Sequence, residues 1–468
     1  MEKKKTKIEE FERNIYDIYD SDNIGYQVKQ GLTEDIVAEI SKNKKDPAWM
    51  RDLRMKSLKI YNETELPNWG PSLHELNMDN IVTYVRPGTS MTDDWKELPD
   101  DIRTTFERLG IPEAEWKSLS GVGAQYDSEV VYHSMREQLL EQGVIYTDME
   151  TALREYEDIV KEYFMKLLPA TEHKFMALHG AVWSGGSFVY VPEGVKVSMP
   201  LQSYFRLNAP GAGQFEHTLI ICEKNSSLHF IEGCSAPRHN TINLHAGGVE
   251  LYIKEGATLR YSTIENWSKN MLNLNTKRAL VEKDGKIEWV SGTFGSHITM
   301  LYPMSILKGE NAKSEYTGVS FASSNQYLDT GSKVVHAAPN TSSTVSSKSI
   351  SKNGGNTTYR SSVTIMPQAK NSKCSVICES LMMDDISRSD TIPVMDVRND
   401  KADIGHEAKI GRISEKSIYY LMTRGLSEEE AKALIVRGFV EPVTKELPLE
   451  YAVEMNRLIG LELEGSIG

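Results

Sequence analysis

The chain has 468 residues, a net charge of −13 and a sequence pI of about 5.5. This acidic balance argues against a general nucleic-acid-binding role, and no apolar run reaches the roughly 18 residues that span a bilayer. Met1 is not followed by a secretory signal, and the four cysteines are too sparse for a disulfide framework. A reducing, cytoplasmic location is therefore expected.

The first region, residues 1–165, has mainly helix and loop signals. Within it, apolar residues recur at helical spacing from 150 to 169, which predicts one amphipathic helix ended by Pro169. The residues on its apolar side are Leu153, Tyr156, Val160, Phe164 and Leu167.

Short β-like runs replace the helical pattern from Ser187 onward, and turn-forming clusters separate them. The clusters begin at residues 192, 223, 254, 282, 308, 338, 367 and 399, at intervals of 31, 31, 28, 26, 30, 29 and 32 residues. A β-sandwich commonly has a turn every 8–12 residues, whereas a spacing near 30 is typical of a coil that goes around once per repeat. The region 166–410 is therefore predicted to be a stack of parallel β-coils. The alternative is an irregular all-β domain in which the spacing is accidental.

The last region, residues 411–468, returns to helical signals. A first helix is predicted over 414–424, closed by Gly425. Ser427 and Glu430 form a capping box for a second helix that ends at Gly438, and a third helix runs from 449 to about 463. The acidic first turn of the second helix argues against DNA reading, so these helices either cap the β-coils or dock a partner.

Common catalytic motifs are absent from the sequence. It contains no GxxxxGK[ST] phosphate loop, no GxSxG elbow, no HExxH pair and no CxxC. Any ATP hydrolysis that the protein needs must therefore come from another subunit.

The most reactive side chains lie late in the repeats. Cys374 and Cys378 are four residues apart, which places both on one face of a strand. Cys374 and His406 each lie seven residues after the start of their turn cluster, so we expect them to be near-neighbours in adjacent coils, to within one or two positions. With Glu407 they offer thiolate, imidazole and carboxylate ligands for iron. The alternative is that the cysteines are buried as small apolar side chains.

The repeat also relates distant cysteines. Cys234, Glu265 and Cys378 each lie 11 residues after their turn start, which predicts that they share one side of the stack. Cys234 and Cys378 are then five coils apart, roughly 24 Å at about 4.8 Å per strand. This separation excludes a disulfide, whose Cα atoms lie within about 7 Å.

Several longer stretches carry a family resemblance. They are FRLNAPGAGQFEHTLI (205–220), FIEGCSAPRHN (230–240), LRYSTIENW (259–267), TYRSSVTIMPQA (358–369), GHEAKIGRISE (405–415) and the tail 424–460. In them the chain resembles, nearly end to end, the SufB branch of the SufB/SufD family, which holds the scaffold subunits of the SUF iron–sulfur cluster assembly system.

The resemblance implies a right-handed parallel β-helix between helical terminal regions, and a scaffold for de novo cluster assembly rather than an enzyme. It implies a SufC-type ABC ATPase docked through the C-terminal helices, so that ATP acts only through this partner. A SufD paralogue or a second copy of the chain would complete the complex. A cysteine desulfurase or sulfur carrier, apo acceptor proteins and reduced flavin (FADH2) are also expected.

The family's sulfur-handling positions can be carried over residue by residue. Cys234 matches the cysteine that accepts persulfide sulfur, and it would need a thiolate favoured by cations such as Arg206 or Lys277. A sulfur path is implied by four matching positions and by Glu265, where the family often carries Gln. The matching positions are Arg206, Asn208, Trp267 and Lys277.

The family's cluster-binding positions lie further along. Cys378 matches the cysteine that receives sulfur and ligates the nascent cluster. His406 and Glu407 match two members of a Glu-His-Glu cluster whose first position is Gly405 here, which leaves Glu407 as the expected carboxylate. Cys374 matches no family position and is either an additional metal ligand or a packing residue.

Two alternative functions belong to other classes. A β-helix carbohydrate-active enzyme would need paired carboxylates on an exposed coil face, and the sequence has no aligned Asp/Glu ladder. A β-helix adaptor would bind the ATPase without itself carrying a cluster.

Overall fold

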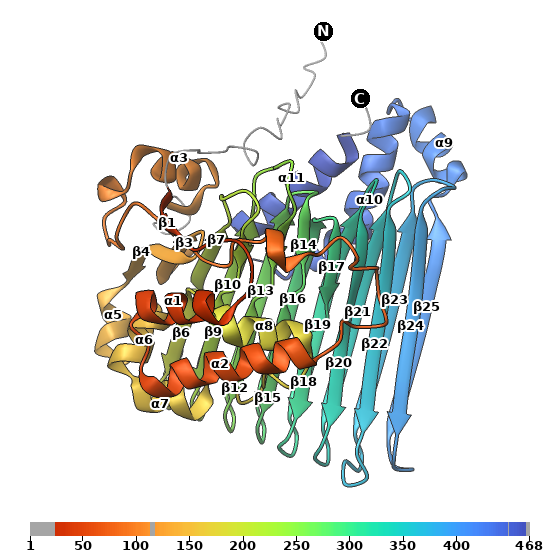
Figure 1. The fold of residues 1–468 in the computed structure, drawn as a ribbon. Coiled ribbons are helices and arrows are strands. Elements are labelled where there is room, and N and C mark those ends of the chain that lie inside the picture. Colours follow the sequence, from red (N-terminus) through yellow and green to blue (C-terminus); the bar gives the residue numbers. More distant parts are fainter. Residues whose placement is uncertain (1–23, 113–117, 448, 465–468) are drawn as a thin grey trace.

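The computed structural model describes residues 24–112, 118–447 and 449–464. Its core is a parallel β-helix in which the chain winds between two sheets, with helices at both ends of the sequence (Figure 1). The predicted fold class is confirmed.

The first sheet has ten strands in the order β25-β23-β21-β19-β16-β13-β10-β7-β3-β4, all parallel to their neighbours except β4. Their bounds are β3 (Gly121–Tyr126), β4 (Glu129–Met135), β7 (Leu201–Arg206), β10 (Ser227–Ser235), β13 (Thr258–Trp267), β16 (Lys286–Gly295), β19 (Lys313–Ala322), β21 (Ser342–Ser351), β23 (Lys373–Met382) and β25 (Asp403–Arg412).

The second sheet faces the first and has thirteen strands. They are β5 (Ile145–Asp148), β6 (Gly186–Val191), β8 (Gly213–Gln214), β9 (His217–Cys222), β11 (Asn243–His245), β12 (Gly248–Ile253), β14 (Met271–Asn273), β15 (Thr276–Val281), β17 (Ile298–Leu301), β18 (Met304–Leu307), β20 (Tyr327–His336), β22 (Asn356–Ile365) and β24 (Arg388–Val397). The antiparallel pair β1 (Ile24–Gln27) and β2 (Val85–Pro87) forms a separate small sheet.

The coils change shape along the stack. Early coils have two strands in the second sheet, such as the three-residue β14 and the six-residue β15. From β20 on, a single ten-residue strand replaces both, because the first half of β20 pairs with β17 and its second half with β18. The early coils are therefore bent, and the later coils are flat.

All eight predicted turn clusters lie at one edge, where the chain passes from the second sheet to the first. Asn and Asp, which tolerate a positive φ, hold left-handed positions in these turns at Asn225, Asp284, Asn311, Asn340 and Asn371. The turns also bond to one another along the stack, as when Asn340 N donates to the Lys370 carbonyl at 2.8 Å. The prediction from the turn spacing is confirmed.

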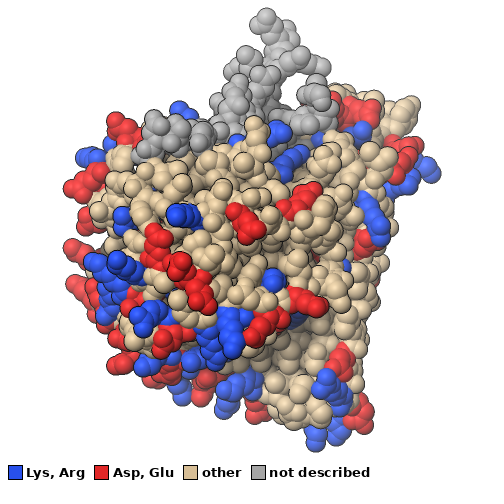
Figure 2. All heavy atoms as spheres, viewed as in Figure 1, with Lys and Arg blue, Asp and Glu red and all other residues tan. Residues whose placement is uncertain are grey.

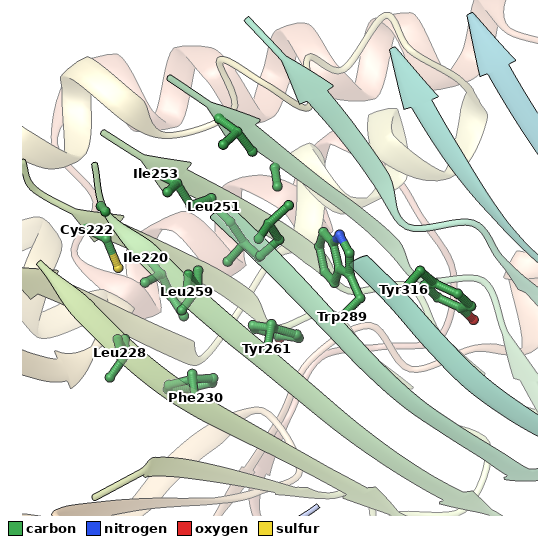
Figure 3. Packing of buried hydrophobic residues seen from close by; sticks show 14 of the residues in the cluster. Ile220, Cys222, Leu228, Phe230, Leu251, Ile253, Leu259, Tyr261, Trp289 and Tyr316 are labelled. Carbon is green, nitrogen blue, oxygen red and sulfur yellow. The ribbon is translucent and has the colours of Figure 1, made fainter. Parts of the chain in front are cut away.

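The space between the sheets at this turn edge is filled by apolar and aromatic side chains (Figure 3). Phe230, Tyr261, Trp289 and Tyr316 occupy one inward position in four successive coils. Phe230 and Tyr261 stack with ring centroids 5.7 Å apart. No coil could bury these side chains alone, so stacking supplies the core.

The N-terminal region packs on the first coils and adds β3, β4 and β5 to the two sheets. Its helical segments are α1 (Glu34–Lys44), α2 (Ala48–Glu63), η2 (Met78–Asn80), η3 (Trp95–Glu97), α3 (Asp100–Arg108), α5 (Glu137–Glu141), α6 (Met149–Glu155) and α7 (Glu157–Tyr163), with α8 (Lys174–Val182) following. The single helix predicted over 150–169 is wrong, because the non-helical backbone of Tyr156 (φ −127°, ψ 38°) separates α6 from α7. The predicted apolar side nevertheless packs into one cluster around Phe188.

The C-terminal helices are α9 (Glu415–Thr423), α10 (Glu428–Thr444) and α11 (Leu449–Glu464). The Ser427–Glu430 capping box is confirmed. The predicted stop at Gly438 is wrong, because α10 continues through it and buries Val436, Val440 and Val443 against the outer face of the first sheet. Burying each valine contributes about 1.5–3 kcal/mol, which outweighs the roughly 1 kcal/mol cost of a helical glycine.

In the part of the chain that the structure describes, no helix has both the length and the apolar composition to cross a bilayer. On the face shown in Figure 2, acidic and basic side chains are interspersed over the N-terminal helices.

Candidate functional site

Strand β10 places Cys234 inside the β-helix. Side chains alternate along a strand, so Glu232 and Cys234 point inward while Ser235 points outward. Cys234 pairs with Phe205 of β7 and with Glu265 of β13, and its side chain is fully buried. The predicted alignment of Cys234 with Glu265 is confirmed.

A lysine connects the carboxylates beside Cys234. The ammonium of Lys277, which points inward from β15, lies 2.8 Å from Glu232 Oε1 and 3.5 Å from Glu265 Oε1. It also donates to Thr263 Oγ1 at 3.2 Å. The second oxygen of Glu232 accepts a hydrogen bond from the Tyr261 hydroxyl.

The chain of hydrogen bonds continues on the other side of Glu265. Asn273 Nδ2 donates to Glu265 Oε2 at 2.7 Å, and Asn273 Oδ1 lies 2.7 Å from His245 Nδ1. The other ring nitrogen of His245 meets the Glu216 carboxylate. Burial alone would lower the pKa of His245, but Glu216, Glu265 and Asn273 together raise that pKa above its usual value. We call these seven residues the buried charge network: Glu216, Glu232, His245, Tyr261, Glu265, Asn273 and Lys277.

The network keeps the Cys234 thiol protonated. Burial raises the pKa of Cys234 well above its usual value, and the charges of Glu232, Glu265 and Glu216 raise it further, whereas Lys277 opposes them. Lys277 therefore favours the thiolate, as expected, but burial and the three carboxylates outweigh its effect on the pKa of Cys234. Cys234 thus lies fully buried beside carboxylates of the network.

Three other predicted path residues lie around the network. Trp267 points inward, with its ring centroid 4.7 Å from that of His245. Arg206 lies on the opposite face of the first sheet, where it donates to Ser235 Oγ at 3.1 Å. Asn208 follows β7, and its backbone N–H donates to Asp127 Oδ1 at 2.7 Å. The structure therefore brings Trp267, Glu265 and Lys277 together with Cys234 and leaves Arg206 outside the interior.

Two rows of small or polar side chains run along the interior from Cys234 to Cys378, and we call them the polar ladder. One row is Cys234, Glu265, Thr293, Ser320, Ser349 and Ser380; the other is Glu232, Thr263, Ser291, Gly318, Ser347 and Cys378. The two cysteines are five strand pairings apart, about 24 Å at about 4.8 Å per step. The predicted separation is confirmed, although Cys234 aligns with Ser380 rather than with Cys378.

At Gly318 the polar ladder has no side chain, and the Tyr316 ring occupies the space. A Cβ atom added there would lie 2.5 Å from the hydroxyl of Tyr316, which folds over the glycine. Tyr316 in turn neighbours Tyr359, with ring centroids 6.3 Å apart. Burial raises the pKa of Tyr316, and the charges of Glu265 and Cys378 contribute to the rise. Tyr316 therefore lies between the two ends of the ladder.

Cys378 lies near the open end of the stack. Its Sγ is 3.9 Å from Nε2 of His406 on the last strand, β25. Burial raises the pKa of Cys378 to about 12. Cys374 lies on the same inward face, as predicted, but His406 pairs with Val376 and meets Cys378 instead of Cys374.

Glu407 is separated from this pair. It follows His406 on β25, so its side chain points outward, and its carboxylate lies 2.9 Å from Lys409 Nζ. The space around Gly405 is empty, because an added Cβ would meet no atom within 4 Å. Among the residues that the structure describes, no three His, Cys, Asp or Glu side chains gather closely enough to hold a metal ion.

Most of the buried charge network was missed by the sequence reasoning. Glu232 could have been found, because it lies two residues before Cys234 in the same predicted strand and must share its face. Glu216, His245 and Asn273 lie on or beside short second-sheet strands of two or three residues, which carry too little pattern to be recognised.

Comparison with known proteins gives consistent matches along the chain. Residues 205–439 match the family model described as "SUF system FeS cluster assembly, SufBD core domain", and residues 39–203 match "SufBD protein N-terminal region". Proteins named "Iron-sulfur cluster assembly SufBD family protein" from Staphylococcus haemolyticus, Staphylococcus epidermidis and Staphylococcus aureus are each 51% identical over 453 residues. The matches cover 97% of this chain and 97% of each relative.

Proposed function

The chain belongs to the SufB/SufD family of iron–sulfur cluster assembly proteins, and we propose that within it the chain is a SufB-type scaffold on which a cluster is built. The observation that carries the proposal is the polar ladder, which joins two inward-facing cysteines through the core of the β-helix. At the turn edge of the stack, by contrast, the interior is filled mainly by apolar and aromatic side chains.

Sulfur is accepted at Cys234. A carboxylate of the buried charge network takes the thiol proton, and the thiolate attacks the terminal sulfur of a persulfide on the desulfurase or sulfur carrier. The S–S bond of the donor breaks, and the donor cysteine leaves as a thiolate that is then protonated. Lys277 holds Glu232 and Glu265 in place, and Trp267 packs beside His245 of the same network.

Sulfur leaves Cys234 as hydrosulfide. Cleaving the Cys234 persulfide requires two electrons and a proton, which a dithiol or the reduced flavin of the complex supplies while becoming oxidised. The hydroxyl groups of the polar ladder offer hydrogen bonds to HS⁻ along its way to Cys378.

Iron and sulfide meet at the open end of the stack. Cys378 and His406 supply two ligands, and Cys374 is the candidate for a third from the same inward face. Glu407 can contribute only from the outward face. A partner chain completes the coordination, after which the cluster passes to apo-proteins.

Two surfaces serve the partners in this proposal. The last strands β24 and β25 have unpaired edges and exposed apolar side chains, which suit a SufD paralogue or a second copy of the chain. The exposed Tyr419 and Tyr420 of α9 suit a SufC-type ATPase, which carries out all ATP hydrolysis. The four buried, free cysteines fit a cytoplasmic location, where thiols stay reduced.

The competing function is an adaptor that binds the ATPase without carrying a cluster. Anaerobic purification with the partner subunits, followed by iron and sulfide analysis, separates the two. We expect Cys378→Ala to lower bound iron and sulfide at least about tenfold. Cys222→Ala, a change at a buried cysteine in the apolar core, is the matched control and keeps both. If wild type and Cys378→Ala bound equal amounts of iron and sulfide, the scaffold function would be excluded and the adaptor function would remain.

The sulfur route has its own test. Cys234→Ala blocks uptake of labelled sulfur from the desulfurase but leaves chemical reconstitution with iron and sulfide intact. Failure of both steps to the same degree would contradict transfer from Cys234 to Cys378.

A further inference from the structure

A pocket of about 260 Å³ lies on the outer side of the second sheet, away from the polar ladder. The chain that follows α2 crosses in front of the strands there and forms one wall (Figure 1). The start of α8, the β14–β15 connection and strands β17, β18 and β20 form the rest. Residues lining it include Trp69, His173, Asn275, Tyr302 and Lys333.

Two aromatic rings give the pocket an apolar surface. The ring centroids of Trp69 and Tyr302 are 5.1 Å apart and tilted by 55°. The ammonium of Lys333 lies 5.4 Å from the Tyr302 centroid and 6.0 Å from that of Trp69. These rings can pack against a planar ligand while Lys333 faces its charged end.

The charge of Lys333 is not neutralised by an ion pair. The lining has two further cations: Arg278 is held by both carboxylate oxygens of Glu172, and Lys277 pairs with two carboxylates of the buried charge network. Within the described ranges, no carboxylate oxygen lies within 4.0 Å of Lys333 Nζ. An acidic group in the pocket would therefore supply the partner that Lys333 lacks.

Asn275 is a second polar group without a partner. Its side chain is buried, with 3% of the residue exposed, and neither its amide nitrogen nor its amide oxygen has a hydrogen-bond partner. Leaving a buried amide unsatisfied is costly, so such a group points to a missing partner. An amide presents a donor beside an acceptor, which matches the edge of a heterocycle.

His173 adds a neutral polar group. Burial lowers its pKa to about 4, so the ring is uncharged at neutral pH, and Nε2 lies 3.3 Å from Thr276 Oγ1. His173 therefore adds no positive charge, and we expect the acidic group of a ligand to lie next to Lys333.

We propose that this pocket binds a small planar heteroaromatic acid. The ring system packs against Trp69 and Tyr302, its donor–acceptor edge meets Asn275, and its acidic group meets Lys333. The pocket is separate from the proposed cluster site. Strand β15 lies between the pocket and the buried charge network: Thr276 and Arg278 face the pocket, and the ammonium of Lys277 between them belongs to the network.

Two dyes of the same shape test the proposal on the full chain. 8-Anilino-1-naphthalenesulfonate carries an acidic group, and N-phenyl-1-naphthylamine lacks it. We expect one saturable site that binds the sulfonate about tenfold more tightly than the neutral dye, because a charge-assisted hydrogen bond forms only with the sulfonate. Binding is followed by dye fluorescence and by quenching of tryptophan emission.

Variants assign the dye to the pocket. Lys333→Met should weaken sulfonate binding about tenfold and leave the neutral dye unchanged, and Trp69→Leu should weaken both dyes. Lys313→Met removes an exposed lysine of the first sheet and should change neither. Circular dichroism shows whether each variant is folded, and Lys333→Gln, which also removes the charge, replaces Lys333→Met if that variant does not fold. Absence of a saturable site, or equal sulfonate binding in wild type and Lys333→Met, would overturn the proposal.

Discussion

The buried charge network holds three carboxylates against one lysine and one histidine in the interior of a β-helix. Charges so placed persist only because they are paired and hydrogen-bonded, and removing one partner leaves an uncompensated buried charge. Lys277 is the group that Glu232 and Glu265 share.

Replacing Lys277 by Met should lower the free energy of unfolding by about 3–5 kcal/mol, because two buried carboxylates lose their cation. Urea denaturation measures the change. Lys313→Met is the control at an exposed position, and the double variant Lys277→Met/Glu232→Gln should recover part of the loss. A loss under about 0.5 kcal/mol, the range typical of surface substitutions, would show that the network is not ion-paired as described.

At this scale the sequence predicted some contacts and missed others for a physical reason. Cys234 and Glu265 pair as expected because both follow turns of four residues, 223–226 and 254–257. Cys378 is shifted by two positions because the turn before β23, residues 366–372, is longer. Turn clusters mark where a coil begins, but the length of each turn depends on packing with its neighbours.

Among the elements, the first-sheet strands carry the polar ladder, and Gly318 on β19 leaves room in it for the Tyr316 ring. Gly318→Ala should add a methyl group to the ladder and displace the Tyr316 ring from its place over residue 318. We expect sulfur from Cys234 to reach Cys378 at least about tenfold more slowly, while persulfide formation at Cys234 is unchanged. Labelled sulfur located by peptide mass spectrometry distinguishes the two steps.

The matched control for that change is Gly411→Ala, where an added Cβ meets no atom within 4 Å. It makes the same substitution on β25 and should affect neither step. Equal transfer in Gly318→Ala and Gly411→Ala would mean that sulfur does not pass between Ser291 and Ser347.

Helix α9 is the least covered of the three C-terminal helices, with Tyr419 and Tyr420 exposed at 70% and 57%. Changing both to Ser should weaken binding of the ATPase partner at least about tenfold, because large aromatic side chains dominate interface energies. Calorimetric titration measures this loss. Tyr327→Ser, at an exposed tyrosine of the second sheet, should leave the affinity unchanged. If the double variant bound the ATPase with wild-type affinity, the ATPase would have to bind another surface of the protein.

Helix ends show where local signals stop being sufficient. Ser427 and Glu430 begin α10 as predicted, because a capping box is satisfied within one turn. Gly438 does not end it, because burial of valines on the first sheet, a contact between residues far apart in sequence, decides the outcome.

For the molecule as a whole, stability should fall as the pH is lowered from 7 to 5. Burial lowers the pKa of four histidines to about 4: His133, His173, His229 and His336. In the unfolded chain these histidines bind protons near pH 6.5, whereas in the native chain they stay neutral until the pH is much lower. Each contributes a loss of about 2 kcal/mol at pH 5. Asp127, whose pKa burial raises to about 6, and His245, whose pKa is also raised, act in the opposite direction.

Urea midpoints at the two pH values measure this dependence. His336→Gln removes one of the four groups and should reduce the difference between pH 7 and pH 5 by about 2 kcal/mol. A midpoint that is the same at both pH values would show that the histidines titrate normally in the native protein.

The overall architecture was predictable because one period runs through more than two hundred residues, from the turn at 192 to the turn at 399. The change from bent to flat coils at β20 was not, since it depends on which short strands merge into one.

The two ends of the stack differ, and this asymmetry limits how many chains can join. At the first coil, the N-terminal region adds antiparallel β4 and β5 and packs its helices beside them, whereas at the last coil β24 and β25 end in free edges. A solenoid with free edges at both ends could add copies indefinitely and grow into a fibre. With free edges at only one end of the stack, we expect each chain to extend its sheets by pairing with one neighbour. That neighbour would pair through its own free edges. We therefore expect the joint to be limited to a pair of chains, whichever chain the second member is.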